Sequence, residues 1–189
     1  VQNLAVGYGD YTLLSDLNLT INAGERVILT GQNGAGKTTL LRTIAGYLPP
    51  LNGKIQLGSS VRLGYMSQEQ ESLDNNSTAL ETIMRAAPMS ETEARSFLHY
   101  FLFEGDDPLR PIATLSYGER SRLSLATLVA AGCTFLLLDE PINHLDIASR
   151  TQFEEALSNF PGTILAVVHD RYFIEHFATE LWHVQDGGI

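Results

Sequence analysis

Short apolar runs separated by glycine-rich turns form the N-terminal part of the chain, and this pattern predicts strands. The continuous run Val27-Ile28-Leu29 is typical of a strand that is buried on both faces. A helix is predicted after it, because Gly46 and the two prolines that follow would end a helix there. The expected elements are strands at 3–9, 17–21, 25–31, 53–57 and 61–66, and a helix at 37–46.

The apolar spacing becomes helical in residues 74–125, which predicts a helical lobe. Ser90 with Glu93, and Ser116 with Glu119, form two capping boxes, in which each side chain satisfies a free amide at a helix start. After a turn at Gly132 come a strand at 134–139, a helix at 149–160 and a strand at 162–170. Two strands separated by a helix predict a βαβ unit and therefore a parallel sheet.

Composition narrows the class of protein. The chain has 189 residues, 44% apolar residues and a net charge of −10, which fits a globular protein without a generally basic surface. The single cysteine, Cys133, excludes an internal disulfide and indicates a reducing, cytoplasmic compartment; we expect its side chain to be buried. The sequence has no run of about 18 apolar residues, so no segment is expected to span a membrane. Because the sequence begins without Met and ends without a tail, we expect a fragment of a longer chain.

Residues 31–39, GQNGAGKTT, match the phosphate-binding pattern G-x-x-x-x-G-K-[ST] between a predicted strand and a predicted helix. Glycines allow the loop to curl so that its amides, with the positive end of the helix, hold a phosphate. The lysine adds a positive charge, and one threonine hydroxyl can bind Mg²⁺. The candidate ATP-binding residues in this loop are Gly31, Asn33, Gly34, Ala35, Gly36, Lys37, Thr38 and Thr39.

Polar residues stand at or just after the carboxyl ends of three predicted strands, where ligands of α/β sheets bind. Asp139 is expected to hold Mg²⁺ through water, and the adjacent Glu140 to polarise the attacking water. His169 could donate a hydrogen bond to the γ-phosphate or to that water, and Gln68 could reach Mg²⁺ or water. Tyr8 has two readings, stacking on the adenine base or packing in the core.

Taken in order, these segments resemble the motifs of ATP-binding cassette (ABC) proteins. GQNGAGKTT resembles the Walker A motif, Gln68 the Q-loop, LSYGE the signature, FLLLDEP Walker B, INHLD the D-loop and VVHD the H-loop. The resemblance implies an α/β fold of the P-loop NTPase class, with a mostly parallel core sheet, an N-terminal antiparallel β subdomain and a small helical lobe. It implies one ATPase domain over 1–189, with its core in 1–73 and 126–189, the helical lobe in 74–125, and ATP and Mg²⁺ as cofactors.

The same resemblance implies a second cassette as partner, in the same chain or as a dimer. Cassettes of this family pair head to tail, so Ser116, Tyr117, Gly118 and Glu119 would face the ATP of the partner, with Asp146 at the same junction. The family usually has glycine where Tyr117 stands; the side chain either packs aside or weakens this half of the site.

DEPINHLD and HDRYF are similar to strings of the ABC-F subfamily, with Ile142 in place of Thr and Val168 in place of Ser. This implies a soluble protein that acts on the ribosome, in translation or antibiotic resistance. HLDIASRTQFEEAL resembles the second cassette of such proteins more than the first. The alternative is the ATP-binding subunit of a membrane transporter, whose partner would be a transmembrane subunit. A third reading is a nucleotide-gated clamp, against which the intact Glu140 argues.

Overall fold

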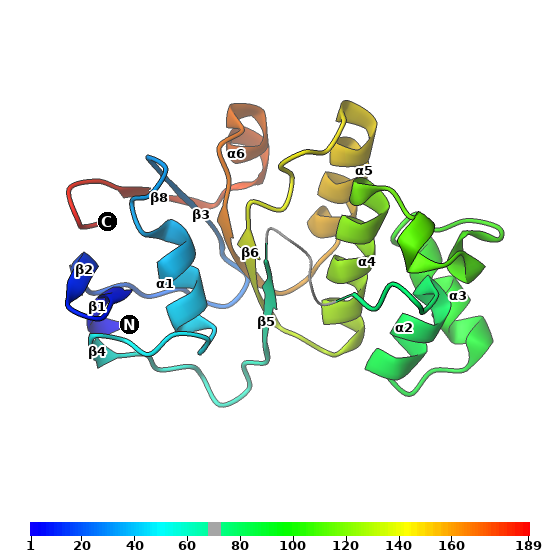
Figure 1. The fold of residues 1–189 in the computed structure, drawn as a ribbon, viewed down its shortest axis with the longest axis horizontal. Helices are drawn as coiled ribbons and strands as arrows, with labels where there is room; N and C mark the ends of the chain where they lie inside the picture. Colours follow the sequence, from blue (N-terminus) through cyan, green and yellow to red (C-terminus); the bar gives the residue numbers. More distant parts are fainter. Residues whose placement is uncertain (68–72) are drawn as a thin grey trace. The chain divides into compact units, whose positions relative to one another are not determined.

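The computed structural model describes residues 1–67 and 73–189, in two compact units (Figure 1). The sheet unit consists of Val1–Tyr65, Thr134–Pro141 and Gly162–Ile189. The helical unit consists of Met66–Cys133 and Ile142–Pro161. Both units are therefore assembled from segments that are distant in the sequence.

Parallel strands form the main sheet of the sheet unit, in the order β5-β6-β7-β3-β8. The strands are β3 (Arg26–Gly31), β5 (Leu63–Met66), β6 (Phe135–Asp139), β7 (Thr163–Val167) and β8 (Glu180–Val184). β3 pairs in parallel with β7 and β8, and β6 pairs in parallel with β7, which confirms the predicted parallel sheet. The register places Asp139 opposite Val167, so β6 and β7 end side by side. Residues that follow these two strands are thereby brought together.

The second sheet of this unit is antiparallel, in the order β2-β1-β4. Its strands are β1 (Gln2–Tyr8), β2 (Tyr11–Leu17) and β4 (Asn52–Lys54). The predicted strand at 17–21 is wrong, because the chain turns at Gly9 and Asp10 and pairs Tyr8 with Tyr11. This tight turn starts β2 earlier than the apolar spacing suggested.

Two helices complete the sheet unit, α1 (Lys37–Ile44) and α6 (Arg171–Phe177). α1 packs against β1 of the antiparallel sheet and against β3 and β6 of the parallel sheet. The core between them is aliphatic and aromatic, as expected where strands are buried on both faces. Its fully buried members include Leu4, Val6, Val27, Leu29, Leu40, Leu41, Leu137 and Leu165. This core fixes the start of α1 against the end of β3.

The helical unit contains the helices α2 (Ala79–Ala86), α3 (Glu91–His99), α4 (Tyr117–Ala130) and α5 (Ile147–Ser158), with the short 3-10 turns η1 (Asp107–Leu109) and η2 (Ile112–Thr114). Both predicted capping boxes are present, and a third joins Thr78 and Glu81 at the start of α2. Residues 126–133 and 142–161 belong to this unit, whereas the sequence grouped them with the core. Cys133 is half-buried and not buried as expected, because it follows the turn after α4.

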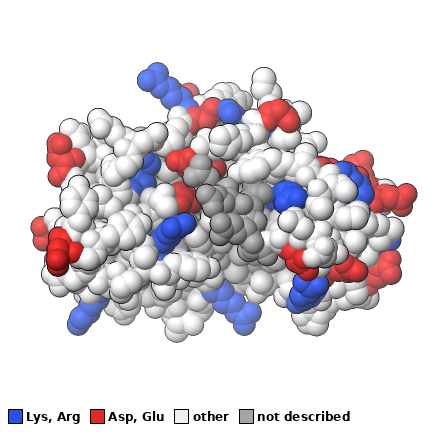
Figure 2. All heavy atoms as spheres, in the orientation of Figure 1, with Lys and Arg blue, Asp and Glu red and all other residues white. Residues whose placement is uncertain are grey.

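Charge is unevenly distributed over the helical unit. At the right of the view in Figure 2, Asp and Glu side chains lie over this unit with arginines among them. Residues 74–125 contain more acidic residues than arginines, and no lysine. This surface is therefore poorly suited to the phosphates of a nucleic acid.

Candidate functional site

The glycine-rich loop between β3 and α1 has the backbone that a phosphate cradle needs. Gly31 has a φ of 139°, and a Cβ built there would lie 2.6 Å from the carbonyl oxygen of Val184. Gly36 caps α1 in the left-handed conformation, with φ 99° and no side-chain hydrogen bond to the helix start. Only glycine adopts these positions without strain. The start of α1 is therefore left without a side-chain cap, as expected of an anion site.

Lys37 is the first residue of α1 and folds back over this loop. Its Nζ donates hydrogen bonds to the carbonyl oxygens of Gly31 at 2.8 Å and Gln32 at 2.7 Å. The residue is 5% exposed, and burial lowers the pKa of Lys37 while the charges of Glu140 and Asp139 act to raise it. A positive charge is thus held at the mouth of the loop.

A pocket of about 290 Å³ opens beside this loop. It is lined by Tyr8, Leu13, Asn33, Gly34, Gly36, Lys37, Thr38, Thr39 and Glu140. Tyr8 is 52% exposed, so the core-packing reading of Tyr8 is not what the structure shows. The hydroxyl of Thr39 donates a hydrogen bond of 3.4 Å to the phenol oxygen of Tyr8. One pocket thus contains residues from the loop, from β1 and from the end of β6.

Asp139, the last residue of β6, is 2% exposed and accepts a hydrogen bond at each carboxylate oxygen. Thr38 donates to Oδ1 at 3.0 Å, and the phenol of Tyr65 donates to Oδ2 at 3.2 Å. Burial raises the pKa of Asp139, while these two hydrogen bonds lower it. Burial also raises the pKa of Tyr65 to about 12, so its phenol is protonated at neutral pH.

Glu140 and His169 follow neighbouring strands and meet beyond the edge of the sheet. Nε2 of His169 lies 3.6 Å from Oε1 of Glu140. Glu140 has a φ of 52°, an uncommon conformation for a residue with a side chain, and its amide donates to the carbonyl oxygen of Val167 at 3.1 Å. The backbone of Glu140 is thereby tied to the end of β7. Gln68, the remaining candidate for this site, lies outside the described residues.

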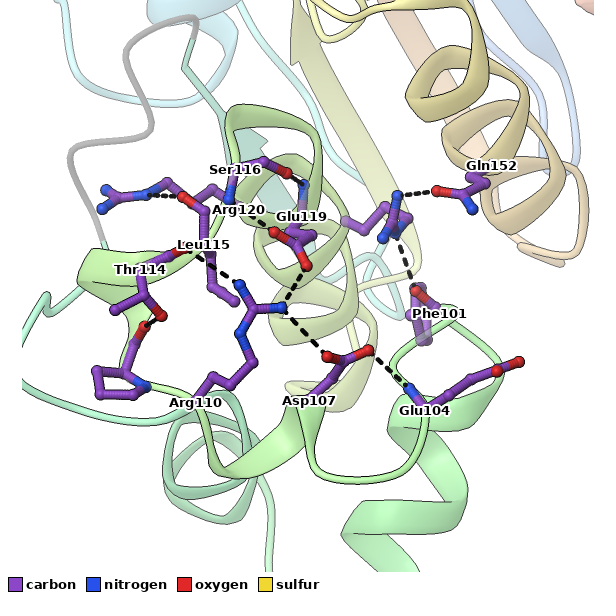
Figure 3. Close-up of polar contacts among 12 residues, drawn as sticks. Phe101, Glu104, Asp107, Arg110, Thr114, Leu115, Ser116, Glu119, Arg120 and Gln152 are labelled. Carbon is purple, nitrogen blue, oxygen red and sulfur yellow. Dashed lines mark hydrogen bonds and ion pairs between the residues drawn. The ribbon is translucent and has the colours of Figure 1, made fainter.

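The signature segment starts α4 in the helical unit (Figure 3). The hydroxyl of Ser116 accepts a hydrogen bond of 3.2 Å from the amide of Glu119, and the amide of Ser116 donates to Oε2 of Glu119 at 2.7 Å. Arg110 donates to the other carboxylate oxygen of Glu119 at 2.8 Å and to Asp107 at 3.1 Å. Burial opposes ionisation of Glu119, but the hydrogen bonds from Ser116 and Arg110 prevail and lower its pKa. Arg110 therefore fixes the carboxylate of Glu119 within the capping box.

Two close contacts join the start of α4 to the segment that precedes and begins α5. The rings of Tyr117 and His144 pack edge to face, with centroids 6.0 Å apart. A Cβ at Gly118 would lie 2.6 Å from both Cβ and Oγ of Ser149. Asp146 caps α5, because its carboxylate accepts a hydrogen bond of 2.8 Å from the amide of Ser149. This bond and a second one from the Ser149 hydroxyl lower the pKa of Asp146. The start of α4, which carries the signature candidate, thus packs directly against the start of α5, which carries the D-loop candidate.

Comparison with known proteins decides the family. The model of the family described as "ABC transporter" matches residues 14–143. The chain belongs to this family. It is an ATP-binding cassette from a family of ATPases, and its α/β fold agrees with the prediction.

Curated relatives cover the whole cassette. It is 43% identical to the protein YdiF of Bacillus subtilis (strain 168) and 40% identical to the energy-dependent translational throttle protein EttA of Escherichia coli (strain K12), over 100% of this chain in each case. It is 39% identical to ABC transporter F family member 2 of Arabidopsis thaliana. The matched parts are 30%, 35% and 28% of those proteins, so the chain spans about a third of their length. The predicted resemblance to the ABC-F subfamily is confirmed.

A solved structure shows the same fold as this ABC cassette. An ATP-binding protein from Pyrococcus furiosus superposes with a TM-score of 0.80 at 24% identity, over 97% of this chain and 95% of that chain. None of the helices in the described residues has the length and apolar character that crossing a bilayer requires.

Two residues of the cassette's sites were not found from the sequence. Tyr65 donates a hydrogen bond to Asp139, which is 74 positions later in the sequence, and no local sequence pattern predicts such a contact. Arg110 contacts Glu119, nine residues later, from a turn between helices. In each case a long side chain supports a residue that the motifs did identify.

Proposed function

We propose that this cassette binds Mg-ATP at the pocket beside the glycine-rich loop and hydrolyses it when a second cassette closes over that pocket. The observation that carries the proposal is the shared lining: Glu140 lines the same pocket as Lys37 and Thr38. A carboxylate that faces a phosphate cradle is placed to polarise a water beside the γ-phosphate.

The roles within the pocket follow from its contacts. The loop amides and Lys37 hold the phosphates, and Thr39 can add a hydrogen bond. The exposed ring of Tyr8 offers a face for the adenine base. The side chain of His169, beside Glu140, donates to the γ-phosphate. Asn33 and Ala35 contribute backbone to the cradle.

Oxygen donors suited to Mg²⁺ stand beside the cradle. The hydroxyl of Thr38 and the carboxylate of Asp139 are 3.0 Å apart, and Mg²⁺ takes such hard ligands while it keeps several waters and phosphate oxygens. We propose Thr38, Asp139 and Gln68 as the protein's contribution. The ion would neutralise phosphate charge.

The signature would serve the ATP of a partner cassette. The hydroxyl of Ser116 accepts a hydrogen bond from the amide of Glu119. A hydroxyl that accepts one hydrogen bond still has its own proton to donate. Capping α4 and donating to a γ-phosphate are therefore compatible, and Ser116 does not have to leave the cap. At Gly118 a Cβ would clash with Ser149, so this glycine lets the start of α4 pack against α5, where Asp146 is the N-cap.

For the whole protein we propose an ABC-F type role on the ribosome, because a translational throttle protein and an F family member are among its relatives. We propose a cytoplasmic location on the same ground. The acidic helical unit argues that ribosomal RNA is not contacted through residues 74–125.

Glu140→Gln tests the proposal, with Glu175→Gln, an exposed residue of α6, as the matched control. We expect the Glu140 variant to bind ATP like the parent and to hydrolyse it at least about 100-fold more slowly, while the control hydrolyses normally. Equal hydrolysis by parent and Glu140 variant would refute the role of Glu140. Co-sedimentation of the ATP-loaded variant with ribosomes tests the second part, and its absence would refute the ribosomal role alone.

A further inference from the structure

The phenol of Tyr65 contacts the buried carboxylate that stands at the proposed magnesium position. Tyr65 donates to Oδ2 of Asp139 at 3.2 Å, and Thr38 donates to Oδ1 at 3.0 Å. The two hydroxyls come from different elements, β5 and the first turn of α1. Both oxygens of the carboxylate are therefore oriented, each by a different element.

Tyr65 is itself held in place. Its ring packs at a tilt against the ring of Tyr47, with centroids 5.3 Å apart. The pKa of Arg42 is raised by its interaction with this phenol. Two hydrogen bonds thus connect Tyr65 of β5, through Asp139 at the end of β6, to Thr38 in the first turn of α1.

Without the phenol, Oδ2 would lose the only partner that the described contacts give it. An aspartate in a nearly dry site would then be free to rotate about its side-chain bonds, or to turn both oxygens toward the cation. Groups behind a metal-binding carboxylate commonly set its orientation and the affinity of the ion.

We propose that Tyr65 is a positioning residue for the magnesium carboxylate: it holds Oδ2 of Asp139 so that Oδ1 faces the Thr38 hydroxyl and the cation. This inference rests on the proposed function, since it concerns the ion of the same site. It predicts that Tyr65 controls the affinity for the divalent ion and leaves the affinity for metal-free nucleotide unchanged.

Tyr65→Phe removes only the phenol oxygen, and Tyr47→Phe, at a neighbouring ring that is 68% exposed, is the matched control. The measurement is Mn²⁺ binding by electron paramagnetic resonance in the presence of a non-hydrolysable ATP analogue. We expect the Mn²⁺ dissociation constant to rise about tenfold in Tyr65→Phe and to stay at the parent value in Tyr47→Phe. Unchanged Mn²⁺ binding in Tyr65→Phe would overturn the proposal, and so would a lowered melting temperature without a change in Mn²⁺ binding.

A double-mutant cycle with Asp139→Asn tests whether Tyr65 acts through this carboxylate. In the Asp139→Asn background, Tyr65→Phe should cause no further loss of Mn²⁺ affinity. A full additional loss would show that Tyr65 acts elsewhere and would overturn the proposal. Failure of the parent to bind the analogue even without metal would instead refute the proposed function, so the two failures are distinct.

Discussion

Nε2 of His169 lies 3.6 Å from Oε1 of Glu140, although 29 positions separate the two residues and they follow different strands. The register of the parallel sheet accounts for this proximity, because Asp139 pairs with Val167 at the ends of β6 and β7. The amide of Glu140 reinforces it by binding the carbonyl of Val167. The two side chains are thus presented together by backbone hydrogen bonds.

Replacing His169 by Ala should separate hydrolysis from binding. We expect ATP affinity close to that of the parent and a single-turnover rate lowered by about 100-fold, because the proposed donor to the γ-phosphate, which lies beside Glu140, is lost. His176→Ala is the matched control, since His176 is exposed on α6. His169→Gln, which keeps an N–H donor, should retain more activity than His169→Ala. Parent-like hydrolysis by His169→Ala would contradict the role.

Replacing Gly118 by Ala should destabilise the protein through a steric clash. The added Cβ would lie 2.6 Å from the side chain of Ser149, and such overpacking costs about 1–3 kcal/mol of unfolding free energy. Ser149→Gly removes both clashing atoms, so in that background Gly118→Ala should cost little. Chemical denaturation of the four proteins measures this. Equal costs in both backgrounds would mean that the contact with Ser149 does not explain the glycine.

Replacing Tyr117 by Gly distinguishes a side chain that packs aside from one that obstructs closure. The ring contacts His144 within the same unit, so we expect the assembled protein to keep its ATPase rate. The loss of the aromatic contact should lower the unfolding free energy by about 1 kcal/mol. Tyr117→Phe, which keeps a ring, is the control for that loss. A clear rise in ATPase rate in Tyr117→Gly alone would show that the ring obstructs closure.

Features that depend on neighbouring residues were predictable from the sequence. The glycine loop and the two capping boxes are local, because their hydrogen bonds join residues a few positions apart. The turn at Gly132 was also recognisable, since this residue has a φ of 76° just after α4. The third capping box, Thr78 with Glu81, carries the same signal and could have been found.

Features that depend on distant pairing were harder to predict. Residues 17–21 have the alternation of a strand, yet β2 forms at 11–17 because pairing with β1 decides its limits. α6 and β8 were not predicted, and β8 is a strand whose pairing with β3 spans more than 150 positions. The support of Asp139 by Tyr65 is of the same kind, since only the folded sheet brings them together.

The way in which the chain divides between the two units has a mechanical consequence. The backbone passes from one unit to the other at four places, after Tyr65, Cys133, Pro141 and Pro161. The crossing after Pro141 follows Glu140 by one residue and enters the helical unit at Ile142, five residues before α5 begins at Ile147. A protease cut at any single crossing would leave the units tethered by three others. Any movement of one unit against the other therefore requires backbone changes at all four crossings.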